Sequence, residues 1–224
     1  FLEKYLMPVA SKVSNNRYLQ SIGRGFSILL PVTIMGAIFL LLQTLQIPVY
    51  QEFIKATKLN VILGFVPAIT TNMLAVYLVF LIGKSFMEQN GYADDATAAG
   101  MFSLLVFFLM IPLGVSGVAA ESKEVVNIAA ALNTRFLGAS GLFTAIIVGL
   151  LVPTVYIFTL KRGWVIKLPD GVPPQISHAF SSLIPGFIIA ILFSLVRYGF
   201  SMTSYANFNQ FIYTFLQQPL TGLG

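Results

Sequence analysis

Five long apolar runs constrain the fold of this chain more than any other feature of its sequence. They occupy residues 26–45, 65–82, 96–115, 142–160 and 183–196. An α-helix rises about 1.5 Å per residue, so about 20 apolar residues cross the hydrocarbon core of a bilayer. Only 9% of all residues are charged, whereas about a quarter are charged in a typical soluble domain. The runs therefore predict a membrane protein.

The unbroken character of these runs favours helices over the strands of a β-barrel. Barrel strands alternate apolar and polar residues over about ten positions, and these runs do not alternate. We therefore expect an all-α polytopic protein with about five transmembrane helices. Asp94 and Asp95 precede the third run and are expected to cap its helix. The fifth helix extends to residue 200 if Arg197 reaches the membrane surface with its long side chain.

Both ends of the chain have amphipathic patterns typical of helices that lie on a membrane surface. We divide the chain into an interfacial helix (residues 1–24), a five-helix membrane scaffold and dimerisation domain (25–203), and a C-terminal amphipathic helix (204–224). No signal peptide is expected, because the first apolar run is too long and lacks a small-residue cleavage site. The apolar face expected of the last helix consists of Phe208, Phe211, Ile212, Phe215 and Leu216, opposite a polar face that includes Asn207, Asn209 and Gln210.

The basic residues predict how the chain is oriented in the membrane. When the five spans alternate in direction, eight of the 13 Lys and Arg residues lie on the same side as the N-terminus. Cytoplasmic segments collect Lys and Arg, so we expect a multi-pass protein of the bacterial cytoplasmic membrane with its N-terminus in the cytoplasm. The net charge of +5 is then explained by topology and by contact with anionic membrane lipid, and a nucleic-acid partner is not expected. The inside group is Lys4, Lys12, Arg17, Arg24, Lys84, Lys161, Arg162 and Lys167; the outside group is Lys55, Lys58, Lys123, Arg135 and Arg197.

The loop between the fourth and fifth runs is the strongest candidate for a partner-docking surface. Its sequence "KLPDGVPP" is stiff, because Pro169, Pro173 and Pro174 each fix a φ angle and remove a backbone donor. Ser177 is expected to be the N-cap of the following helix. The candidate docking residues in and beside this loop are Lys161, Arg162, Lys167, Asp170 and His178.

Residues that could carry chemistry are scarce. His178 is the only histidine, and its neighbours Ala179, Phe180 and Ser181 supply no carboxylate, so a helix-entry role is favoured over proton or phosphoryl transfer. No catalytic residue, metal site or cofactor is expected. The polar side chains of Asn72 and Gln43 are expected to bond neighbouring helices. Gly36, Gly100 and Gly149 are expected to mark close approaches between helices.

Three motifs resemble one transporter family. The segment "VIKLPDGVPPQISHAFSSLIPG" resembles the loop before the fifth helix of the membrane IIC component of bacterial sugar phosphotransferase systems, in the lactose/cellobiose/chitobiose family. The segment "NNRYLQSIGRGFSILLPVTIMGAIFLLL", with Gly25, Pro31 and Gly36, is similar to the family's entry into its first span. The segment "FLQQPLTGLG" is similar to the stretch that precedes the family's second half. The motifs occur in the family's order along essentially the whole chain.

The resemblance implies a permease that takes up a β-linked disaccharide and presents it to a cytoplasmic IIB component for phosphorylation. In that family the phosphoryl groups are carried by partner proteins, on a cysteine of IIB and on histidines upstream of it. The resemblance also implies a homodimer, with the first half of the permease serving as the scaffold. Whether such a permease component is classed as an enzyme stays open, since no catalytic residue is expected in this chain.

One departure from the family pattern limits what can be carried over. The family's sugar-contacting histidine, in "GIHG", and glutamate, in "NEP", have no counterpart between Phe1 and Gly224. We therefore assign no sugar-binding residue and expect these residues beyond position 224. Two alternatives stay open: a standalone membrane scaffold or docking subunit without a translocation path, and an ion-coupled transporter, which the lack of a mid-span acidic residue disfavours.

Overall fold

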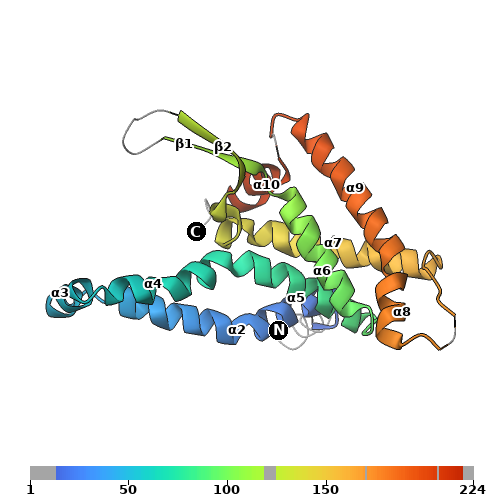
Figure 1. Ribbon diagram of the computed structural model, residues 1–224, viewed down its shortest axis with the longest axis horizontal. Helices are drawn as coiled ribbons and strands as arrows, with labels where there is room; N and C mark the ends of the chain where they lie inside the picture. Colours follow the sequence, from blue (N-terminus) through green and yellow to red (C-terminus); the bar gives the residue numbers. More distant parts are fainter. Residues whose placement is uncertain (1–13, 119–124, 170, 206, 219–224) are drawn as a thin grey trace, which may run out of the picture.

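The computed structural model describes residues 14–118, 125–169, 171–205 and 207–218. Helices make up most of this part of the chain, which confirms the all-α class (Figure 1). Residues 17–24 of the predicted surface helix form the start of α2, and residues 1–13 lie outside the described residues. The elements are α2 (Arg17–Thr44), α3 (Pro48–Ala56), α4 (Leu59–Ile69), η2 (Thr71–Met73), α5 (Leu74–Gln89), α6 (Ala96–Met110), β1 (Leu113–Val118), β2 (Val125–Leu132), η3 (Thr134–Phe136), η4 (Ala139–Gly141), α7 (Leu142–Lys161), α8 (Pro174–Ser181), α9 (Leu183–Ser201), α10 (Phe208–Ile212) and the π-helical turn η5 (Tyr213–Gln217).

Helix α5 is the centre of the bundle and packs against α2, α6 and α7. Glycines let these helices approach closely, as the sequence predicts. A Cβ atom at Gly149 of α7 would lie 3.0 Å from the side chain of Ile82, and one at Gly100 of α6 would lie 3.0 Å from the ring of Phe80. A Cβ at Gly36 of α2 would collide with the hydroxyl of Thr70. Helix packing in lipid depends on this kind of shape fit.

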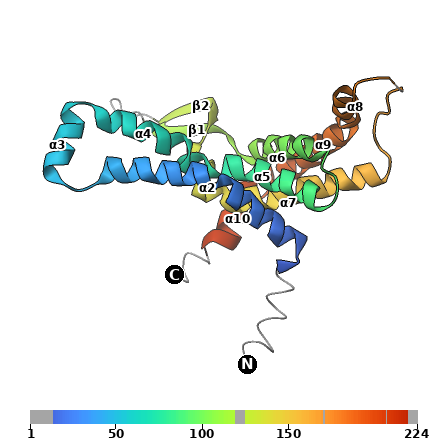
Figure 2. The same ribbon diagram turned by 90° about the horizontal axis from the view of Figure 1, so that it is seen from below.

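Among the described residues, four helical segments are long and apolar enough to cross a membrane: Arg17–Thr44, Leu59–Gln89, Ala139–Lys161 and Ile176–Ser201. The third predicted span is shorter than expected, because α6 ends at Met110 and has 15 residues. At about 1.5 Å per residue, α6 is about 22 Å long. Figure 2 shows that α2 runs beside α4 and α5, and that α3 lies at the end where α2 and α4 are connected.

The second predicted span is broken between α4 and α5. The amide of Ala75 donates to the carbonyl of Leu137, 2.9 Å away on a distant segment, where a regular helix would use the carbonyl of Thr71. The next residue, Gly138, lies so close that a Cβ there would be 2.9 Å from the carbonyl oxygen of Asn72. An inserted backbone segment is a recognised cause of helix breaks. The break is therefore a tertiary effect that a single apolar run does not reveal.

A two-stranded antiparallel hairpin follows α6, where the sequence predicted continued helix up to residue 115. Strand β1 pairs with β2, with Val115 opposite Ile128 and an irregular register between Leu113 and Val115. Pro112 cannot continue a helix, and Gly114 has a φ of +96°, which favours glycine. The hairpin projects away from the helices (Figure 1). The predicted end of the third span is therefore wrong.

The double proline starts α8 one turn earlier than expected. Pro173 is the N-cap and Pro174 is the first helical residue, so the prediction of Ser177 as N-cap is wrong. Proline has no backbone N–H group, but at the first helical position that group would have no partner within the helix. The chain then turns at Ser182 into α9, which extends to Ser201, so the fifth span has its longer form. The expected reason is wrong, because Arg197 bonds the carbonyl of Leu109.

Candidate functional site

Charged side chains join the helices at one end of the bundle. Arg24 of α2 forms an ion pair with Glu88 of α5, with 3.1 Å between Nη2 and Oε2. Arg17 donates from Nη1 to the side-chain oxygen of Asn90, 3.1 Å away. The end of α7 and the start of α6 lie at this same end of the bundle (Figure 1). We call it the charged end.

The predicted docking loop also lies at the charged end. Lys161, Arg162 and Lys167 are all exposed, and His178 on α8 has 47% of its side chain exposed. Asp170 lies outside the described residues. Within the part of the chain that the structure describes, the side chains of Lys161, Arg162 and Lys167 form no hydrogen bond or ion pair. The loop therefore presents free positive charge to its surroundings.

His178 has a carboxylate neighbour that its sequence context does not reveal. Its Nδ1 lies 3.9 Å from Oδ1 of Asp95, the residue that precedes α6. The same Oδ1 accepts a hydrogen bond of 3.3 Å from the hydroxyl of Tyr156, whose side chain is fully buried in α7. Asp95 is the N-cap residue of α6, as predicted, but its side chain makes no capping hydrogen bond there. Asp95 instead connects α6, α7 and α8.

One residue in the sequence points to this cluster. Tyr156 is the one tyrosine in the fourth apolar run, and a buried tyrosine hydroxyl normally finds a polar partner. That partner lies at the start of another span, which a reading of adjacent residues cannot identify. The cluster joins helices and contains one half-exposed imidazole, so it fits a structural contact between the docking loop and the bundle.

The end of α6 is held by two side chains from distant parts of the chain. Arg197 of α9 donates from Nη1 to the carbonyl of Leu109 at 2.6 Å, and Asn209 of α10 donates from Nδ2 to the carbonyl of Met110 at 3.0 Å. These carbonyls lack helical partners because they belong to the last turn. Arg197 thus caps a helix. Asn209 is buried, so its predicted place on an exposed polar face is wrong.

The two mid-span polar candidates behave differently. Gln43 donates to the backbone carbonyl of Asn60 at 3.1 Å, which confirms the predicted contact with a neighbouring helix. Asn72 is exposed at the break between α4 and α5, and among the described residues its side chain has no hydrogen-bond partner. It lines a hollow of about 570 Å³ together with Thr71, Thr134, Arg135 and Ser140.

The described residues contain no group of three or more His, Asp or Glu side chains placed to hold a metal ion. What they provide is a helical membrane framework, with exposed basic side chains at one end and interhelical polar contacts that are structural. This arrangement defines the class of the protein as a polytopic membrane protein.

Comparison with known proteins identifies the family. The chain matches the family described as "Phosphotransferase system, EIIC" over residues 23–224, and it belongs to that family. It is 33% identical over 227 residues to the PTS system cellobiose-specific EIIC component of Geobacillus stearothermophilus, covering 100% of this chain and 50% of that protein. It is 30% identical over 226 residues to the Lichenan permease IIC component of Bacillus subtilis (strain 168), again covering 100% of this chain and 50% of that protein.

A solved structure has the same fold. The transporter ChbC, the IIC component from the N,N'-diacetylchitobiose-specific phosphotransferase system, matches with a TM-score of 0.92 and 36% identity. The match covers 100% of this chain and 52% of the ChbC chain. These results confirm the resemblance drawn from the three sequence motifs. The chain spans about half the length of the relatives it matches.

Proposed function

We propose that this chain is the scaffold part of an EIIC permease that carries a β-linked disaccharide of the cellobiose, chitobiose or lactose type into the bacterial cell. A cytoplasmic IIB component phosphorylates the sugar. The observation that carries the proposal is the match of the whole chain to the IIC transporter ChbC at a TM-score of 0.92. The names of the cellobiose and lichenan relatives support a β-linked sugar as the substrate.

The scaffold role is supported by how the described residues are used. The bundle core consists of apolar side chains and close glycine contacts. The Arg24–Glu88 ion pair and the contact between Asp95 and His178 lie at the charged end. We place the sugar-contacting residues beyond position 224, in the other half of the permease.

The docking loop is proposed as part of the surface that meets IIB. Its support is the exposure of Lys161, Arg162 and Lys167 on or beside a segment that contains three prolines. Free positive charge on a stiff segment steers an acidic partner and costs little entropy on binding. Because the proposed N-terminus is cytoplasmic, this loop is on the side where IIB acts.

The transport proposal is tested in membrane vesicles that hold the full-length permease, with IIB and its phosphoryl donors added. Labelled cellobiose is expected to accumulate as sugar phosphate, and unlabelled β-linked disaccharides are expected to compete where maltose does not. If the folded protein supports neither uptake nor phosphorylation of any disaccharide, the standalone scaffold is favoured instead.

The docking proposal is tested by replacing Lys161, Arg162 and Lys167 with glutamine. The KM for IIB is expected to rise roughly tenfold at low salt while the maximal rate is retained, since rim charges act mainly on association. Lys55→Gln with Lys58→Gln is the matched control, because both residues are exposed at the α3 end. An unchanged KM for IIB in the triple variant would contradict the proposal.

A further inference from the structure

A groove between α7 and α9 opens to the outside of the bundle near the charged end. Its volume is about 380 Å³, and its walls are apolar. The hydroxyl of Thr154 donates to the carbonyl of Leu150 on its own helix, 2.7 Å away. The walls expose no polar surface to the groove, which therefore fits a hydrocarbon chain. Its lining residues are Thr154, Val155, Phe158, Trp164, Ile188 and Leu192.

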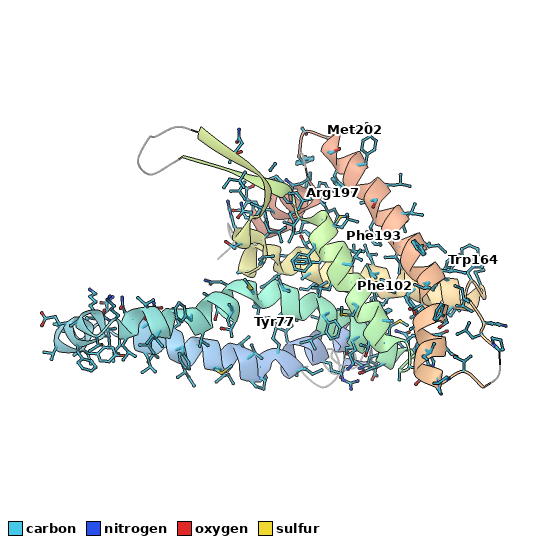
Figure 3. The ribbon with its side chains drawn as sticks, in the orientation of Figure 1. Tyr77, Phe102, Trp164, Phe193, Arg197 and Met202 are labelled. Carbon is cyan, nitrogen blue, oxygen red and sulfur yellow. The ribbon has the colours of Figure 1, made fainter. Side chains whose placement is uncertain are left out.

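The end of α7 fixes Trp164 as one wall of this groove. Gly163 has a φ of +69°, and its amide donates to the carbonyl of Leu160. The amide of Trp164 donates to the carbonyl of Thr159, and both distances are 3.0 Å. This pair of bonds is the Schellman motif, in which a side chain just after the helix packs on its last turn. The indole accordingly meets the ring of Phe158 edge to face, with 5.8 Å between the ring centroids. Figure 3 shows Trp164 at the end of α7 beside the start of α9.

Positive charge lies at the same end of the groove. The guanidinium carbon of Arg162 lies 5.3 Å from the centroid of the Phe158 ring, which also lines the groove. Lys161 and Arg162 are exposed, and in the described part of the chain neither has a carboxylate partner. The guanidinium can therefore donate to an anion near the groove mouth, and Arg matches phosphate oxygens well.

We propose that this groove binds an acidic phospholipid, with an acyl chain between α7 and α9 and the headgroup phosphate at Arg162 and Lys161. An indole is typical of the membrane–water boundary, so Trp164 places the groove mouth at headgroup level. Basic pockets between helices are known to select acidic headgroups. A second copy of this chain fits less well, because a two-fold contact here would bring the same basic residues toward one another.

The test uses quenching of tryptophan fluorescence by lipids with brominated acyl chains. The full permease is placed in vesicles of phosphatidylcholine with increasing brominated phosphatidylglycerol or, separately, brominated phosphatidylcholine. The difference between the protein and its Trp164→Phe variant isolates the signal of Trp164, which is the only tryptophan in the printed sequence. Brominated phosphatidylglycerol is expected to quench Trp164 with a relative affinity roughly fivefold or more above brominated phosphatidylcholine.

Two variants separate this site from general lipid contact. Lys161→Gln with Arg162→Gln is expected to lower the preference for phosphatidylglycerol toward one, while quenching by brominated phosphatidylcholine persists. Arg135→Gln, at a basic residue outside the charged end, is expected to leave the preference unchanged. Equal quenching of the unaltered protein by both lipids would overturn the proposal. Absence of quenching by either lipid would also overturn it, because protein would then cover the groove.

Discussion

Asp95 and His178 lie 3.9 Å apart, Oδ1 to Nδ1, and thereby connect the start of α6 with α8. Asp95 is also the hydrogen-bond acceptor of Tyr156, at 3.3 Å. One carboxylate thus links three helices at the charged end. Because α8 belongs to the segment that presents the docking residues, this contact sets where that segment sits on the bundle.

We predict that Asp95→Ala destabilises the protein by about 1–3 kcal/mol, because the buried hydroxyl of Tyr156 loses its acceptor. The measurement is thermal unfolding in detergent, followed by loss of helical signal or by aggregation. Asp94→Ala is the matched control, since Asp94 is an exposed neighbour with the same charge. Equal effects of the two substitutions would show that charge near α6, and not the hydroxyl contact, is what matters.

The sequence predicted the helices well where the run of apolar residues alone determines the structure. The fourth and fifth runs became α7 and α9 almost residue for residue. The prediction from the sequence failed where a distant segment of the chain contacts the helix. The break before Ala75 exists because Leu137 accepts the amide of Ala75, and nothing between residues 65 and 82 encodes that partner.

The candidate site was predicted only in part for the same reason. The basic residues of the loop are exposed as expected, since their charge keeps them in contact with water. The partner of His178 was missed because Asp95 reaches it only through the folding of the bundle. Asn209 was placed on the wrong face because its spacing suits an amphipathic helix, whereas a free carbonyl at the end of α6 draws it inside.

A second prediction concerns Arg197. Replacing it with methionine keeps much of the apolar stem but leaves the carbonyl of Leu109 without its donor, at a cost of about 1–3 kcal/mol. Arg135→Met should cost less, about 0.5–1 kcal/mol, because within the described residues that exposed guanidinium makes only a ring contact, with Tyr213 at 5.6 Å. Thermal unfolding of both variants in the same detergent checks the order. The reverse order would exclude Arg197 as the cap of α6.

The third prediction concerns the start of α8. Pro173 and Pro174 restrict the unfolded chain and set the first turn of this helix. Replacing both with glycine is expected to lower stability by about 1 kcal/mol per position and to reduce transport by the full permease. Alanine at both positions is the control, because it restores free φ rotation without the additional freedom of glycine. Stability equal to the unaltered protein in the glycine variant would contradict the role of a rigid entry into α8 and α9.

The fourth prediction is the orientation of the chain. The printed sequence contains no cysteine, so single cysteines at Lys167 and Lys55 provide labelling sites on the two sides. Both positions are exposed and lie at opposite ends of the bundle. In intact cells an impermeant thiol reagent is expected to label the Lys55→Cys variant and to label Lys167→Cys only after the cells are opened. The parent permease supplies the background, and labelling of Lys167→Cys in intact cells would reverse the proposed topology.

The last prediction is that the permease forms a homodimer through the half that this chain represents. Helix α2 carries a broad exposed apolar face that includes Ile34, Ile38 and Leu41, and lipid does not by itself drive such faces together. Association must therefore come from shape, and a symmetric pair is the commonest closed assembly. Native mass measurement in mild detergent is expected to give twice the mass of one permease, with no dependence on dilution over a tenfold range. Ile38→Trp places a bulky ring on that face, and it is expected to yield monomers if α2 forms the contact. Leu195→Trp, on the exposed face of α9, is the control. A monomer in every detergent and at every concentration would refute the dimer, and a dimer that both variants retain would place the contact on another face.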